Sequence, residues 1–204
     1  MKQELRKWTN WSIGIAVITF VLAAIFSIVS TLLLSGVTWA VGMMLVLVIV
    51  FIGIFFDMIG IAATAANEVP FHAMASEKIN GSKQAIQIVR NADRFASFCN
   101  DVIGDISGII SGTATALVII QLTVSFQFKE DSLFQYIVSV VFTSVVAALT
   151  VGGKAFGKSV AIQFSTIIIF QVGRLFYFFE NRFNIVIMKE KERKKKKARN
   201  MKRK

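Results

Sequence analysis

Long uncharged stretches dominate the pattern of hydrophobic and polar positions along the chain. No charged residue lies between Ser12 and Asp57, and two later stretches, 106–128 and 132–153, are also uncharged. A helix needs about 20 apolar residues to cross a hydrocarbon core of about 30 Å. Only helices and closed barrels satisfy their backbone groups in lipid, and these stretches are too long and unalternating for barrel strands. The pattern therefore predicts an all-α integral membrane protein.

The apolar stretches divide into four expected membrane-spanning helices. A short turn without charge, 35–39, separates the first two, and the charged segment 126–134 is expected to form an external loop. The expected spans are about 12–34, 37–60, 101–124 and 134–151.

Two further segments favour helices at the membrane surface. In the polar segment 67–98, Ala85, Ile88 and Val89 recur at helical spacing, which predicts one or two short amphipathic juxtamembrane helices broken at Gly81. The apolar stretch 160–173 is short for a crossing and predicts an in-plane or re-entrant helix.

Lysine and arginine residues indicate the orientation. They gather between the second and third spans and after the fourth, whereas the other two loops hold only Lys129. Because basic loops stay on the cytoplasmic side, we expect a multi-pass protein of a bacterial cell membrane with both termini in the cytoplasm.

Composition agrees with this class and locates the charge. The chain has 204 residues, of which 55% are hydrophobic and 17% charged, and its net charge is +11. Most of that charge lies in the tail 189–204, "KEKERKKKKARNMKRK". Beside a membrane domain, such a tail favours an anchor attracted to anionic headgroups over a nucleic-acid arm. A single cysteine excludes an internal disulfide framework.

Acidic and amide side chains at the ends of the second and third spans are the candidates for chemistry. Asp57 lies near the end of the second span, and Asn100, Asp101 and Asp105 open the third. Asp101 and Asp105 are four residues apart and share one face of an α-helix. Such oxygen ligands suit a hard cation such as Mg²⁺ or Ca²⁺. Alternatively, the carboxylates form structural ion pairs with Arg90, Arg94 or Lys154.

Two glycine patterns bear on helix packing and on nucleotide binding. Gly104, Gly108 and Gly112 form a small-xxx-small series, which predicts close packing of the third span on the second span or on a second copy. "GGKAFGKS" (152–159) matches the spacing of a phosphate-binding loop, but a membrane-length run replaces the strand that such a loop must follow. We expect no nucleotide partner. His72 has no metal-ligating neighbour in sequence and is expected to serve packing or the surface.

Three stretches resemble the transmembrane domain of the CNNM/CorC magnesium transporters. They are "GSKQAIQIVRNADRFASF" (81–98), "CNDVIGDISGIISG" (99–112) and "GGKAFGKSVA" (152–161). The resemblance covers about residues 50–180. It implies a homodimer with three crossings per chain, juxtamembrane helices and one Mg²⁺ between the first two family helices.

Those family helices correspond here to the second and third spans, so the span 12–34 is an extra N-terminal helix. The resemblance implies a transmembrane domain at 1–188 followed by the basic cytoplasmic tail at 189–204. It implies metal ligands at Asp57, Asn100, Asp101 and Asp105. Lys154 and Gly157 stand where the family has Glu and Pro, and the family's regulatory CBS domains do not follow.

The sequence therefore predicts a membrane protein, not an enzyme, that binds and transports a divalent cation, Mg²⁺ first and Co²⁺ second. Expected partners are the lipid bilayer, the cation and a second copy of the chain, without nucleic acid. The alternative is a scaffold without transport that engages lipid or a partner protein through its amphipathic segment and basic tail.

Overall fold

The computed structural model describes residues 2–125 and 133–183, and every element in these residues is helical. The expected tail 189–204 and most of the expected loop 126–134 lie outside the described residues. The elements are α1 (Lys2–Ser35), α2 (Trp39–Ala65), α3 (Val69–Ser76), α4 (Ser82–Arg90), α5 (Ala92–Ser97), the π-helix η1 (Phe98–Gly104), α6 (Asp105–Ser125), α7 (Leu133–Gln163) and α8 (Ser165–Phe183).

The described residues contain four helices long and apolar enough to cross a membrane. They are Trp11–Ser35, Trp39–Ala65, Ala92–Ser125 and Gln135–Gln163. Their outward faces carry large apolar side chains, such as Phe20 at 75% exposure and Met44 at 70%. A water-facing surface would not tolerate so much contiguous apolar area, whereas lipid does. The expectation of an all-α membrane-embedded protein is confirmed.

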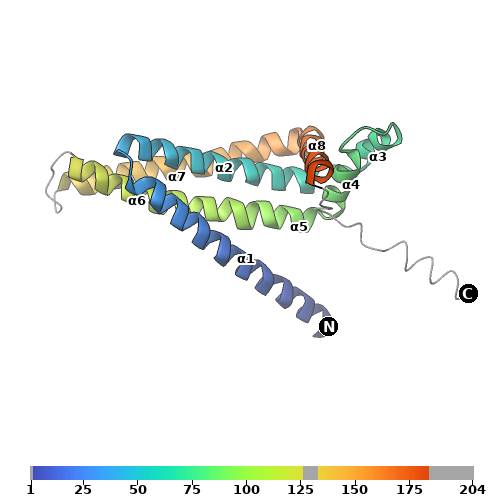
Figure 1. Cartoon of the computed structure of the whole chain (residues 1–204), viewed down its shortest axis with the longest axis horizontal. Coiled ribbons are helices and arrows are strands. Elements are labelled where there is room, and N and C mark those ends of the chain that lie inside the picture. Colours follow the sequence, from blue (N-terminus) through green and yellow to red (C-terminus); the bar gives the residue numbers. More distant parts are fainter. Residues whose placement is uncertain (1, 126–132, 184–204) are drawn as a thin grey trace, which may run out of the picture.

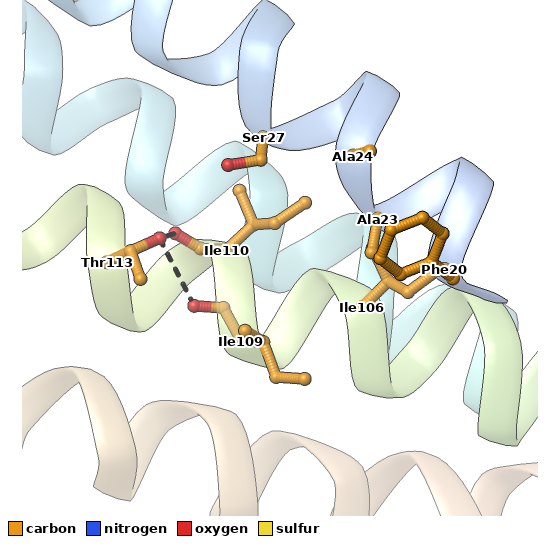
Figure 2. Close-up of a pocket in the computed structure, with 8 residues that line it drawn as sticks. All are labelled: Phe20, Ala23, Ala24, Ser27, Ile106, Ile109, Ile110 and Thr113. Carbon is orange, nitrogen blue, oxygen red and sulfur yellow. Dashed lines mark hydrogen bonds between the residues drawn. The ribbon is translucent and has the colours of Figure 1, made fainter. Parts of the chain in front are cut away.

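Helix α2 is the centre of the bundle. It packs against both α6 and α7, while α1 diverges from the other three long helices (Figure 1). A groove separates α1 from α6, lined by residues of both helices (Figure 2). Helices α3, α4, α5 and α8 gather at one end of the bundle, which we call the α8 end.

Small residues let α2 approach its neighbours. A Cβ atom added to Gly53 would lie 2.9 Å from the Cβ of Ser107 on α6, and one added to Gly60 would overlap the side chain of Asn100. The predicted close packing of the third span on the second is therefore present at Gly104, which lies beside Asp57 of α2. At Gly108 and Gly112, by contrast, no atom of the described residues lies within 4 Å of an added Cβ.

The short helices at the α8 end form a compact layer with α8. Phe71, Ala85, Ile88 and Ile169, from α3, α4 and α8, are fully buried in one apolar cluster there. Gly81 marks the expected break in the segment 67–98, with a φ of 93°. Three short helices form there, rather than the one or two that were expected, because α5 leads directly into η1.

The expected helix at 160–173 is divided between two elements. Its first residues extend α7 to Gln163, and the chain turns near Phe164 into α8. Helix α8 then runs across the end of the bundle and is seen nearly end-on in Figure 1. Phe178 and Leu175 are exposed on α8, which gives it an unburied apolar face.

Candidate charged cluster at the α8 end of the bundle

Three charged side chains on three long helices lie at the same depth. Asp57 of α2, Asp105 of α6 and Lys154 of α7 each follow about 20 residues of helix counted from the opposite end of the bundle. At 1.5 Å per residue this distance is about 30 Å, the thickness of the hydrocarbon core. The charges therefore lie at the edge of that core, where ionised groups cost less than at its centre.

The ammonium group of Lys154 lies between the two carboxylates. Its Nζ atom is 3.6 Å from Oδ1 of Asp105 and 4.0 Å from Oδ1 of Asp57. The side chain of Asp57 is only 16% exposed, that of Lys154 is 26% exposed and that of Asp105 is 67% exposed. Both distances exceed hydrogen-bond length, so electrostatic attraction rather than a fixed hydrogen bond joins these groups.

Gly104 forms one wall of this cluster. A Cβ atom at Gly104 would lie 3.6 Å from Oδ1 of Asp57 and 3.7 Å from Nζ of Lys154. Gly104 is the last residue of η1 and precedes Asp105, so bare backbone lies next to the two charges from α2 and α7. The absence of a side chain leaves space beside the Asp57 carboxylate.

Asn100 adds a side-chain oxygen atom that lies against α2 one helical turn after Asp57. Its side-chain oxygen is buried without a hydrogen-bond partner in the described part of the chain. That oxygen faces Gly60, which follows Asp57 by one turn of α2. A buried carbonyl without a partner costs about 1–3 kcal/mol, so this oxygen has unused capacity to accept a donor or bind a cation.

Asp101 does not join the ion pairs of Lys154. It is exposed, and its Oδ2 atom accepts a 2.6 Å hydrogen bond from the hydroxyl of Ser97. Asp101 and Asp105 were expected on one face of an α-helix. Residues 98–104 instead form the π-helix η1, in which a spacing of four residues also keeps two side chains near one face, so the hydrogen bond to Ser97 is what distinguishes Asp101.

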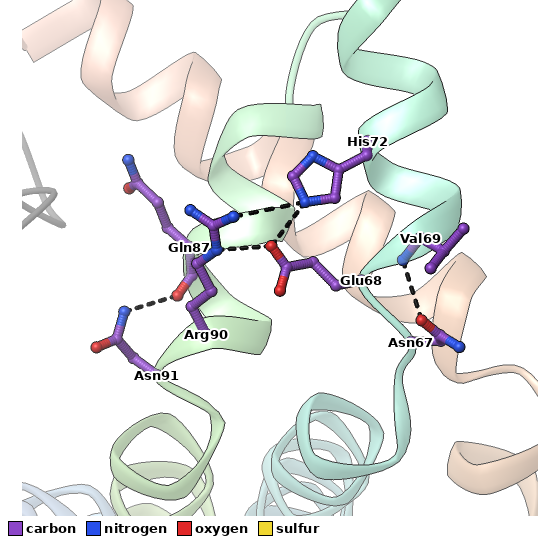
Figure 3. A network of polar contacts seen from close by, with 7 residues as sticks. All are labelled: Asn67, Glu68, Val69, His72, Gln87, Arg90 and Asn91. Carbon is purple, nitrogen blue, oxygen red and sulfur yellow. Dashed lines mark hydrogen bonds and ion pairs between the residues drawn. The ribbon is translucent and has the colours of Figure 1, made fainter. Parts of the chain in front are cut away.

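The arginines proposed as alternative partners have other contacts. Nε of Arg90 lies 2.6 Å from Oε1 of Glu68, and Nε2 of His72 lies 2.7 Å from the same atom (Figure 3). Arg94 lies over the ring of Trp11, with 4.8 Å to its centroid. Of the three basic residues considered, Lys154 alone pairs with the candidate carboxylates within the described residues.

The Glu68 network joins the start of α3 to the end of α4. Loss of contact with water raises the pKa of the Glu68 carboxyl. The hydrogen bonds from His72 and Arg90, together with the charges of these residues, lower the pKa by a larger amount, so it lies below its ordinary value of 4.5. At 2.7 Å from a carboxylate, Nε2 of His72 must carry the hydrogen that it donates. His72 is exposed, as expected of a surface residue, but its contact with Glu68 was not predicted from the sequence.

The donor set fits a hard cation incompletely. Two carboxylates and one free amide oxygen are oxygen ligands of the kind that Mg²⁺ prefers. The described residues, however, contain no group of three or more His, Cys, Asp or Glu side chains arranged to hold a metal ion. A bound cation would have to complete its coordination with backbone carbonyls and water, and Lys154 would have to move away.

The segment "GGKAFGKS" (152–159) lies within the continuous helix α7. A phosphate-binding loop needs backbone amides free of helical pairing between a strand and a helix. Here the glycines serve helix packing, because Ile54 of α2 contacts both Gly153 and Gly157.

No protein-family model, curated protein or solved structure matches this chain. The class therefore rests on the fold itself. The chain is an all-α membrane-embedded protein with an ion-pair cluster at one edge of its apolar bundle.

Proposed function

We propose that this protein binds a divalent cation, Mg²⁺ first and Co²⁺ second, beside Asp57 and Asp105 and passes it through the membrane. The observation that supports the proposal is the position of Lys154, one ammonium group shared by two carboxylates from neighbouring helices. The ammonium group of Lys154 occupies the position between the two carboxylates that a bound cation would take. A divalent ion that enters competes with Lys154 for the same oxygen atoms.

The residues of the sequence prediction take different roles in this proposal. Asp57 and Asp105 supply charge, and the buried oxygen of Asn100 supplies a neutral ligand after a small rotation. Asp101, bound to Ser97 and exposed, attracts the ion at the entrance instead of binding it centrally. When the ion binds, the flexible stem of Lys154 lets its ammonium group reach the headgroup region.

The proposal includes an orientation and an assembly. With basic loops on the cytoplasmic side, the α8 end, both termini and the charged cluster face the cytoplasm. The chain forms a homodimer through the open glycine face of α6, where Gly108 and Gly112 have room for a second helix backbone.

Cation-dependent thermal stability of the purified protein tests the binding step. We expect millimolar Mg²⁺ to raise the unfolding temperature of the wild type and to have no effect on Asp57→Asn. Lys154→Met removes the competing charge, so half-maximal stabilisation should need at least about tenfold less Mg²⁺, a change of about 1.4 kcal/mol. Asp93→Asn is the matched control, because Asp93 makes no ion pair among the described residues.

An unchanged Mg²⁺ response in Asp57→Asn, or the absence of any response in both wild type and Lys154→Met, would contradict cation binding at this cluster. Flux of Mg²⁺ into proteoliposomes then separates binding from transport. Loss of flux with retained Mg²⁺ stabilisation would leave a cation-binding protein that does not transport.

A scaffold without transport is the second candidate, and one observation favours it. Lys154 already neutralises Asp57, the less exposed of the two carboxylates, so the cluster can act as a structural ion pair. Replacing both partners of such a pair with neutral groups often leaves stability unchanged. If the protein is a scaffold, the Asp57→Asn/Lys154→Met variant should be as stable as the wild type and should bind the same lipids and partner proteins. Neither protein should respond to Mg²⁺.

A further inference from the structure

The groove between α1 and α6 is apolar and lies within one leaflet. Its volume is about 280 Å³. Four residues of α1 (Phe20, Ala23, Ala24 and Ser27) face four of α6 (Ile106, Ile109, Ile110 and Thr113), as Figure 2 shows. Ile106 directly follows Asp105, which lies at the edge of the hydrocarbon core. Seven residues of helix take the groove about 10 Å inward, and one leaflet is about 15 Å deep.

The size of the groove selects among possible occupants. A helix from a second copy, about 10 Å across, would need roughly 800 Å³ over this length. An extended acyl chain, about 5 Å across, needs roughly 200 Å³ over the same length. The volume of about 280 Å³ is close to that of one lipid chain and well below that of a whole helix segment.

A cationic side chain lies on the α8 side of this groove. Arg94 of α5 is exposed and lies over the ring of Trp11 on α1, at 4.8 Å from its centroid. This contact joins α1 to α5, which continues through η1 into α6. Trp11 is the first residue of the apolar span Trp11–Ser35 and precedes Phe20 by about 14 Å of helix, so the pair lies on the headgroup side of the groove.

The charge around Arg94 favours an anionic headgroup. No ion pair joins Arg94 to a carboxylate within the described residues. A guanidinium group held in place by an aromatic ring presents its planar fork of donors to a phosphate.

We propose that one anionic phospholipid binds in the groove between α1 and α6, with an acyl chain against Ala24 and Ser27 and its phosphate on Arg94. The lipid fills the space that the divergence of α1 leaves and attaches this helix to the rest of the bundle. This site is separate from the charged cluster and does not depend on cation binding.

Native mass spectrometry of the purified, delipidated protein tests the site, with dioleoyl phosphatidylglycerol and dioleoyl phosphatidylcholine as probes. We expect the wild type to retain one phosphatidylglycerol at least about tenfold more tightly than phosphatidylcholine. Arg94→Gln should reduce phosphatidylglycerol binding to the level of phosphatidylcholine. Ala24→Phe and the smaller change Ser27→Leu fill the groove and should weaken both lipids.

Ala148→Phe is the matched control, because Ala148 is exposed on α7 away from the groove. It should leave binding of both lipids unchanged, and circular dichroism reports whether each variant is folded. Glycerol phosphate, the headgroup alone, should not compete with the lipid. The proposal would be overturned if the wild type retained the two lipids equally, or if folded Ser27→Leu bound phosphatidylglycerol as tightly as the wild type. It would also be overturned if Ala24→Phe kept its lipid and lost self-association.

Discussion

The side-chain amide of Asn100 lies directly against the bare Cα of Gly60. A Cβ atom at Gly60 would overlap Oδ1 of Asn100, and Cβ of Cys99 would lie only 3.1 Å away. This contact joins η1 to α2 one turn from Asp57, so the geometry of the charged cluster depends on it. Close backbone approach at small residues is the main source of helix association in lipid.

Gly60→Ala should therefore destabilise the bundle. The added methyl group has no space, and overpacking of this kind costs about 1–3 kcal/mol. Thermal unfolding in detergent should show a lower transition temperature, and Asn100→Ala in the same chain should restore most of the loss. Gly152→Ala is the control, because an added Cβ there has no atom within 4 Å in the part of the chain that the structure describes. Equal transition temperatures for Gly60→Ala and Gly152→Ala would contradict the contact.

The open glycine face of α6 gives a prediction about assembly. Among the described residues, no atom lies within 4 Å of a Cβ added at Gly108 or Gly112, so we expect the monomer to accommodate a leucine at Gly112. If this face is the homodimer contact, Gly112→Leu should abolish self-association and keep the unfolding temperature of the monomer. Single-molecule photobleaching in nanodiscs measures the copy number. Retention of dimers in Gly112→Leu, with loss in a variant of another face, would move the interface elsewhere.

The stability at acid pH should depend on Glu68. Its pKa is lowered in the folded state, so its contribution is complete above about 4.5 and is lost as the pH falls through the lower folded value. Glu68→Gln should flatten this part of the stability curve, and Arg90→Gln should reduce it, because Arg90 donates to Glu68. Thermal unfolding across this pH range is the measurement. Glu77→Gln is the control, since Glu77 forms no ion pair among the described residues; a curve for Glu68→Gln that matches wild type would exclude the network.

Hydropathy predicted the spanning helices because lipid requires each crossing to pair its own backbone groups. The spans at 12–34 and 37–60 agree with Trp11–Ser35 and Trp39–Ala65. The fourth span continues past its predicted end at 151, because Gly153 and Gly157 pack on Ile54 and need no turn. A hydropathy pattern reports the apolar length of a helix but not its packing against a neighbour, so the ends of the helices were predicted less accurately than their existence.

The candidate site was predicted in part for similar reasons. Asp57 and Asp105 come together, as charges at one depth on neighbouring helices should. Asp101 instead accepts a hydrogen bond from the hydroxyl of Ser97, a side-chain contact that a hydropathy pattern does not reveal. Depth alone distinguishes Lys154 from Arg90 and Arg94, because only Lys154 lies about as far along its spanning helix as the two carboxylates.

A double-mutant cycle between Asp57 and Lys154 should reveal a favourable coupling without Mg²⁺. Asp57→Asn leaves Lys154 with one fewer carboxylate partner, and Lys154→Met leaves the carboxylates without their ammonium partner. The double variant removes both charges of the pair. At a separation of 4.0 Å and partial exposure, we expect a coupling of about 0.5–1 kcal/mol from unfolding measurements in detergent. The pair of Lys154 with Glu77, which lies outside the cluster, should show no coupling. A coupling of zero for Asp57 would mean that the ion pair contributes nothing to the fold.

Gly81 and Lys78 form a paired test of the turn that docks α4 on α8. Both have positive φ, 93° at Gly81 and 58° at Lys78, which costs a side chain about 1–2 kcal/mol. A Cβ atom at Gly81 would also lie 2.6 Å from the backbone nitrogen of Arg174, so Gly81→Ala should lower the unfolding temperature and increase proteolysis near α8. Lys78→Gly removes the strain and has no such backbone contact, so it should raise stability by up to about 1 kcal/mol. We expect stability changes of opposite sign for the two variants, because the turn requires glycine at position 81 but only tolerates lysine at position 78. A stable Gly81→Ala variant with unchanged proteolysis would show that α4 and α8 do not meet through this backbone contact.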